Sequence, residues 1–206
     1  MTSNKAQFQS RKRSHKERGV DVTAIRQRFL IVCEGTKTEV NYFRRFHAPG
    51  LVIQVEGTGM NTLNVVDEAL RLSQEEEYDQ VWCVFDKDDF ALDRFENAIH
   101  RAGQKGFYVA YSNQSFELWF VLHFEYLNTA INRSGYMKKL DNHLRFKYDK
   151  KNTEMYQILK CKIETAIQNA ERLLKNYDKA HSGQNDPSTT VHELVKILLE
   201  QGKPLG

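Results

Sequence analysis

The sequence predicts an α/β fold in which a parallel sheet of about four strands is flanked by helices. Four short apolar runs, each long enough for a strand, lie in the first part of the chain: Phe29–Cys33, Leu51–Val55, Val81–Phe85 and Phe107–Tyr111. Segments with helical spacing separate them, and this alternation is typical of a parallel sheet with helices on both faces. From Asn128 onward no further strand is expected, so the C-terminal region is predicted to be helical.

The first two runs are each followed by a turn and a helix. The run Phe29–Cys33 is apolar throughout, which is typical of a strand buried on both faces. It ends at Glu34-Gly35-Thr36, after which residues with helical spacing begin at Glu39. The second run is closed by glycines, and Asn61 or Thr62 can then cap a helix.

The third run continues directly into Asp86-Lys87-Asp88-Asp89, and a helix is expected over residues 91–105. Gly106 suits the position just after that helix, where glycine is favoured. After the fourth run, Ser115 can cap a short helix over residues 116–124. Its aromatic residues recur at steps of three and four, which predicts that they face the core.

Three further helices are expected at 136–144, 156–176 and 190–201, with a loop over 178–188. The predicted organisation is therefore a basic flexible arm at 1–27, an α/β domain at 28–125, and a helical region at 126–206 packed on that domain.

Charge is unevenly distributed along the 206 residues, which hold 30 Lys and Arg against 27 Asp and Glu. Residues 1–28 carry eight basic and two acidic side chains, so the other 178 residues carry 22 and 25. This places the basic excess in the N-terminal arm. Such an arm suits nucleic acid or an acidic partner, and the alternative is a solvated tail without a binding role.

The composition also excludes several classes of protein. No apolar run approaches the roughly 18 residues of a transmembrane helix, and the N-terminus lacks the apolar stretch of a signal peptide. The three cysteines do not form a disulfide framework. A cytoplasmic protein with no membrane partner is therefore expected.

Carboxylates follow two of the predicted strands. Glu34 follows the first, and Asp86, Asp88 and Asp89 follow the third. Ligands bind at the carboxyl ends of parallel strands, so these side chains meet if the two strands are neighbours. On an extended segment Asp86 and Asp88 point to one side, and their oxygens suit Mg²⁺ or Mn²⁺. The alternative is that these residues are ordinary turn and capping residues.

Several motifs resemble known families. A strand ending in Val-Cys-Glu-Gly, a helix with a second Glu, and a strand ending in Asp-x-Asp are similar to the topoisomerase/primase (toprim) domain. More specifically, residues 28–199 resemble the RloB-like (AbiLii-type) family of prokaryotic defence and restriction-associated proteins. The residues that carry this resemblance lie in four segments: Ile31–Phe43, Tyr78–Asp88, Ala110–Phe124 and Asp186–His192.

The resemblance implies a toprim-like fold and metal-dependent hydrolysis of nucleic-acid phosphodiester bonds, in DNA or RNA, during anti-phage defence. It also implies a partner ATPase of the AAA type. Glu34 matches the toprim glutamate, which acts as a general acid or base or as a metal ligand. Asp86 and Asp88 match the metal-binding, catalytic Asp-x-Asp. Glu39 matches the glutamate that serves a second metal ion in nuclease members.

Three more residues are predicted to act near this site. Lys37 can hold a phosphate at the start of the first helix, or be a solvated lysine. Glu117 and Asp89 can support the metal ligands, and the alternative for Glu117 is that it caps or complements the dipole of its own helix.

Two other functions can be compared with this one. The chain can be a binding module for nucleic acid or a partner protein, with the acidic residues in a structural role. A haloacid-dehalogenase-like phosphotransferase is disfavoured, because that class needs a nucleophilic Asp where this chain has Glu34.

Overall fold

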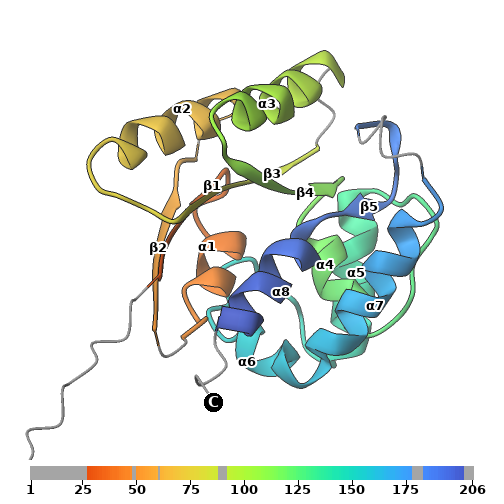
Figure 1. Cartoon of the computed structure of the whole chain (residues 1–206). Coiled ribbons are helices and arrows are strands. Elements are labelled where there is room, and N and C mark those ends of the chain that lie inside the picture. Colours follow the sequence, from red (N-terminus) through yellow and green to blue (C-terminus); the bar gives the residue numbers. More distant parts are fainter. Residues whose placement is uncertain (1–26, 48–49, 60, 88–91, 178–182, 202–206) are drawn as a thin grey trace, which may run out of the picture.

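The structure is a computed structural model that describes residues 27–47, 50–59, 61–87, 92–177 and 183–201. It contains a sheet with helices on both faces (Figure 1), so the predicted α/β class is confirmed. The predicted arm up to residue 26 lies outside the described residues, as do Asp88 and Asp89.

The sheet has five strands in the order β2-β1-β3-β4-β5. They are β1 (Gln27–Cys33), β2 (Leu51–Gly57), β3 (Gln80–Asp86), β4 (Tyr108–Asn113) and β5 (Ser188–Thr189). The first four are parallel, and β1 pairs directly with β3, with Cys33 opposite Val84. The carboxyl ends of β1 and β3 are therefore neighbours, as the clustering of Glu34 with Asp86 requires.

Eight α-helices are described. They are α1 (Thr38–Phe43), α2 (Thr62–Ser73), α3 (Leu92–Gln104), α4 (Glu117–Leu122), α5 (Arg133–Leu144), α6 (Met155–Leu159), α7 (Ile163–Leu174) and α8 (Val191–Gln201), with a short 3₁₀ helix at Lys160–Lys162. None of them combines the length and the apolar character needed to cross a bilayer.

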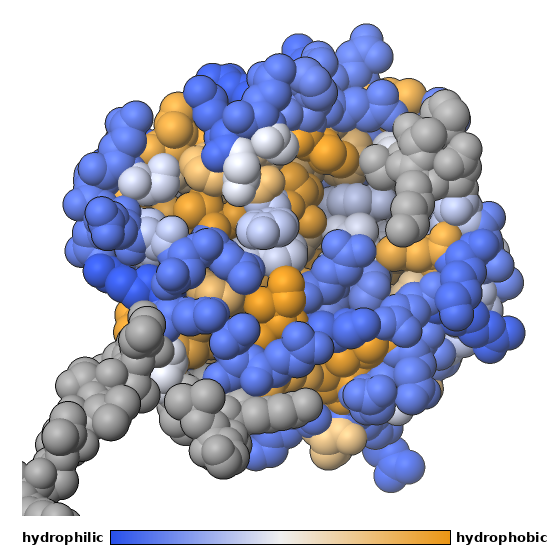
Figure 2. Space-filling model, in the orientation of Figure 1, coloured by the Kyte–Doolittle hydropathy of each residue, from blue (hydrophilic) through white to orange (hydrophobic). Residues whose placement is uncertain are grey.

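The alternating side chains of the central strands explain why their sequences are apolar throughout. In β1, Leu30 and Val32 pack with α2 and α3 on one face, whereas Phe29 and Ile31 pack with the remaining helices on the other. Figure 1 shows this three-layer arrangement. Figure 2 shows hydrophilic side chains over the outer surfaces of the helices and apolar side chains deeper in the molecule.

Two predicted helix ends are confirmed. The Asn61 side chain accepts a hydrogen bond from the Asn64 backbone N–H at the start of α2. Gly106 follows α3 with a φ of +73°, a left-handed conformation that glycine adopts without steric cost.

Three local predictions are wrong. A short strand, β5, does occur after Asn128 and pairs antiparallel with β4; its two residues are too few to show strand periodicity. The helix expected at 156–176 is broken by the 3₁₀ turn at Lys160–Lys162. Ser115 does not cap α4, which begins with Phe116 in the cap position and no side-chain capping bond.

Candidate functional site

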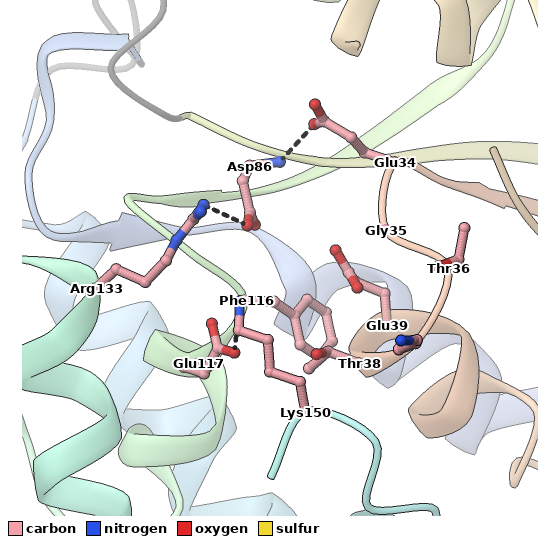
Figure 3. Close-up of a pocket in the computed structure, with 11 residues that line it drawn as sticks. Glu34, Gly35, Thr36, Thr38, Glu39, Asp86, Phe116, Glu117, Arg133 and Lys150 are labelled. Atoms are coloured by element: carbon pink, nitrogen blue, oxygen red, sulfur yellow. Dashed lines mark hydrogen bonds and ion pairs between the residues drawn. The ribbon is translucent and has the colours of Figure 1, made fainter. Parts of the chain in front are cut away.

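A pocket of about 310 Å³ lies at the carboxyl ends of β1 and β3 (Figure 3). It is lined by four carboxylates, three basic residues and parts of the loop after β1: Glu34, Gly35, Thr36, Lys37, Thr38, Glu39, Asp86, Phe116, Glu117, Arg133 and Lys150. The predicted residues Glu34, Lys37, Glu39, Asp86 and Glu117 therefore come together in one place. They come from segments that are distant in the sequence.

Glu34 is fixed at the end of β1 by bonds to the neighbouring strand and to α2. Its backbone N–H donates to the Val84 carbonyl at 2.8 Å, which continues the β1–β3 pairing by one residue. Its carboxylate accepts hydrogen bonds from the Asp86 backbone N–H at 3.2 Å and from the Thr62 hydroxyl at 3.4 Å. The Glu34 side chain thus joins β1, β3 and the start of α2.

Asp86 is the last residue of β3, and its side chain pairs with a residue from the C-terminal region. Arg133 at the start of α5 places Nη2 3.4 Å from Asp86 Oδ2. In Figure 3 the Asp86 carboxylate points toward Arg133 and away from the Glu34 carboxylate. The two strand-end carboxylates are adjacent in the sheet, but they face different partners.

Glu39 lies in α1 with only 6% of its surface exposed. Burial raises the pKa of its carboxyl group above the ordinary value for glutamate, and the negative charge of Glu117 raises it further. The Gly35 backbone passes so close that a Cβ at this position would overlap the Glu39 carboxylate. Glycine after Glu34 therefore lets the loop pack against a buried acid.

Glu117 is the most deeply buried carboxylate of the pocket, with 1% of its surface exposed. Tyr148 donates a hydrogen bond from its hydroxyl to Glu117 Oε1 at 3.1 Å, and Lys150 Nζ lies 3.4 Å from the same oxygen. Both partners come from the loop between α5 and α6. Such pairing offsets much of the cost of burying the charge.

Lys37 lines the pocket just before α1 and is exposed. With Arg133 and Lys150 it gives the pocket three basic side chains beside four acidic ones. A phosphate group placed here would meet positive charge on several sides, because the three residues come from different segments.

The donor chemistry of the pocket suits a hard divalent cation, since four of the described side chains that line it offer carboxylate oxygens and none offers imidazole or thiolate. Within the described part of the chain, however, no three His, Cys, Asp or Glu side chains are grouped as a metal site. The observed ion pairs explain this, because Asp86 faces Arg133 and Glu117 faces Lys150. Asp88 and Asp89 lie outside the described residues.

Sequence reasoning missed Arg133, Tyr148 and Lys150. No local pattern marks Lys150 or Tyr148, since each reaches Glu117 across about 30 residues of sequence. For Arg133, a usable signal exists in Asn132, whose side chain accepts from the Gly135 N–H and so starts α5. By contrast, the aromatic residues of α4 are buried, as predicted.

Comparison with protein families agrees with the RloB-like resemblance of the motifs. The model of the RloB-like protein family matches residues 29–198. This span includes every residue of the pocket and all five described strands, except for the first two residues of β1. Searches of curated proteins and of solved structures gave no match. Because the family match covers most of the sequence, the chain belongs to the RloB-like protein family.

Proposed function

We propose that this chain is a toprim-like, Mg²⁺- or Mn²⁺-dependent hydrolase of nucleic-acid phosphodiester bonds that acts in prokaryotic anti-phage or restriction-associated defence. The observation that carries the proposal is the pocket itself. Four carboxylates and three basic residues line one cavity at the carboxyl ends of neighbouring parallel strands, which is where open α/β sheets bind ligands.

In this proposal Glu34 and Asp86, together with Asp88, would hold the divalent ion. The ion would supply Lewis-acid polarisation of the phosphodiester. Asp86 now faces Arg133 at 3.4 Å, and Arg133 can pair with a substrate phosphate when Asp86 binds the ion. A bidentate guanidinium is well suited to that role.

The other pocket residues have roles that follow from their surroundings. Glu39, whose pKa is raised by burial and by Glu117, can hold a proton closer to neutral pH than an exposed glutamate, as a general acid or base must. Lys37 and Lys150 can bind the non-reacting phosphate oxygens. Nucleic acid and an AAA-type ATPase are the partners we propose.

One observation favours a second function. Two of the four carboxylates, Asp86 and Glu117, are already paired with basic side chains, and no three of the four form a metal site among the described residues. In that case the chain is a binding module for nucleic acid or for a partner protein, and the acidic residues hold the helical region against the sheet.

Cleavage assays with single- and double-stranded DNA and with RNA distinguish the two functions, provided that Mn²⁺ and the partner ATPase are included. For a hydrolase, Asp86→Asn and Glu34→Gln should each lower the cleavage rate at least ~100-fold, because each removes a charged ion ligand. Glu96→Gln is the matched control, since Glu96 is exposed on α3 outside the pocket. Metal-dependent cleavage that survives in both pocket variants would contradict the proposal, and a wild-type protein without cleavage would favour the binding module.

A further inference from the structure

The body of the protein divides into an acidic part and a basic part. Residues 29–125 contain eight Lys and Arg against sixteen Asp and Glu, whereas residues 126–177 contain eleven against five. The basic excess is therefore not confined to the N-terminal arm, contrary to the sequence expectation. Arg133 and Lys150 show that the basic part meets the acidic part at the pocket.

The highest density of positive charge in this part is the loop between α5 and α6. Residues 145–151, here called the basic loop, read Arg-Phe-Lys-Tyr-Asp-Lys-Lys, with four basic side chains and one acidic. Arg145, Lys147 and Lys151 are exposed. Lys150 instead enters the pocket from this loop, as Figure 3 shows.

The basic loop has a defined position because Tyr148 anchors it. The Tyr148 backbone N–H donates to Asp141 Oδ1 at 2.6 Å, and its hydroxyl donates to the buried Glu117 at 3.1 Å. The Tyr148 ring is buried and lies 6.2 Å from that of Phe120. The loop is therefore fixed to the pocket wall at Tyr148, and its Lys150 lines the pocket.

Phe146 occupies an unusual position within the basic loop. Its side chain is 43% exposed although it is a phenylalanine. The other large exposed aromatic of the described chain, Tyr108, stacks on Trp82 at 4.9 Å, whereas Phe146 has no ring partner among the described residues. One residue separates it from Tyr148, so their Cα atoms lie within about 7 Å of each other.

We infer that the basic loop binds single-stranded nucleic acid and places its backbone at the pocket, with Phe146 stacking on one base and Lys147 and Lys151 contacting phosphates. An exposed aromatic ring among lysines is the combination that binds single strands, because a duplex leaves no base face open for stacking. This inference rests on the proposed function, since it supplies the substrate class for the same pocket.

Fluorescence anisotropy with labelled single-stranded and duplex oligonucleotides of the same sequence, with Ca²⁺ in place of Mn²⁺ to supply a divalent cation without supporting cleavage, tests the role of Phe146. Phe146→Ala should weaken single-strand binding by about 5- to 100-fold, the loss of one stacked base. Phe146→Tyr should restore it. Ile158→Ala is the matched control, because Ile158 is a 37% exposed apolar residue outside the loop and should change affinity little.

The salt dependence of the same measurement tests the lysines. The double variant Lys147→Gln, Lys151→Gln should reduce the steepness of the slope of log affinity against log salt concentration by roughly 1.4. Each lost contact to a single-strand phosphate contributes about 0.7 to that slope. The variant Lys105→Gln, Lys175→Gln removes two exposed lysines at the ends of α3 and α7 and should leave the slope unchanged.

The outcomes separate this inference from the proposed function. Binding that depends on Phe146 and the two lysines, in a protein that cleaves nothing when Mn²⁺ and the partner ATPase are added, would refute the hydrolase and keep the loop assignment. If the wild type cleaves nucleic acid but Phe146→Ala binds the single strand as tightly as the wild type, the loop assignment is refuted and the hydrolase is not. Equal affinity for duplex, or no binding to either oligonucleotide, would also overturn it and leave the loop as a surface for protein.

Discussion

At the scale of single residues, the pocket depends on close packing around its buried acids. Glu39 and Glu117 expose 6% and 1% of their surfaces, yet both line the same cavity. Lys150 and Tyr148 compensate Glu117, and the close approach of the Gly35 backbone leaves no room for a side chain beside Glu39. These contacts can be tested one residue at a time.

Gly35→Ala should destabilise the fold by about 1 kcal/mol, the lower end of the usual cost of overpacking, because its Cβ would overlap the Glu39 carboxylate, the end of a flexible but buried side chain that must shift. Gly103→Ala is the matched control. Gly103 lies in α3 with open space around it, so alanine there should stabilise by about 0.5–1 kcal/mol. Urea unfolding of the two variants measures both changes in stability. If the two alanine substitutions changed the free energy of unfolding by the same amount in the same direction, the tight packing at Gly35 would be contradicted.

Two buried histidines predict a dependence of stability on pH. Burial lowers the pKa of His123 and of His192 from 6.5 to about 4. Between pH 6.5 and about pH 4, these two histidines therefore bind protons in the unfolded chain but not in the folded chain. Stability is complete above the unfolded pKa and falls as the pH decreases toward 4. From pH 7 to pH 5 each histidine should cost about 2 kcal/mol.

Urea unfolding at the two pH values isolates this effect when the variant His123→Gln, His192→Gln is compared with the wild type. The variant should lose less stability on acidification. His100→Gln, at an exposed position of α3, should lose as much as the wild type. A double variant as sensitive to acid as the wild type would exclude these two histidines as the cause.

At the scale of elements, the short strand β5 ties the C-terminal helices to the sheet through side-chain hydroxyls. Thr190, just after β5, accepts a hydrogen bond from the Tyr111 backbone N–H at 2.9 Å. Thr189 donates to the Tyr111 carbonyl at 2.9 Å and bonds to Ser112. The backbone pairing with β5 covers only Ser112 and Asn113 of β4. The two threonine hydroxyls extend the hydrogen bonding to the backbone of Tyr111 as well.

Thr190→Val should therefore destabilise the protein by about 1–3 kcal/mol, because it keeps the shape of threonine and removes the hydroxyl that accepts from the Tyr111 N–H. Thr153→Val is the matched control, since its hydroxyl bonds only to an exposed glutamate and its loss should cost less than about 0.5 kcal/mol. Thermal unfolding compares the two, and a Thr190 variant as stable as the control would show that β5 does not depend on this bond.

Elements with a long periodic pattern could be predicted from the sequence, and those set by tertiary contacts could not. The four parallel strands are apolar because both faces are covered, so their sequences alone identify them. A two-residue strand has no period to detect. The break between α6 and α7 at Lys160–Lys162 contains no Gly or Pro to mark it.

The same distinction applies to the candidate site. Glu34 and Asp86 could be placed because each directly follows a predicted strand, and parallel pairing brings strand ends together. Arg133 and Lys150 approach these strands only through the packing of α4, α5 and α7 against one another. No spacing in the sequence encodes that packing, so the basic half of the pocket could not be foreseen.

At the scale of the whole molecule, an acidic sheet domain and a basic helical region meet at one pocket. The two parts share a continuous core that joins β1 and α1 to α4, α5, α7 and α8. The net charge of +3 hides this division. For a polyanionic substrate, the basic region provides attraction, while the carboxylates need a cation before a phosphate can come close.

That need for a cation is the central claim, and anomalous scattering from crystals grown with Mn²⁺ tests it most directly. The account predicts an anomalous peak between the carboxyl ends of β1 and β3, within bonding distance of Glu34 and Asp86, that is lost in Asp86→Asn. A well-ordered pocket in which Asp86 still pairs with Arg133 at saturating Mn²⁺, with no peak beside either carboxylate, would contradict it.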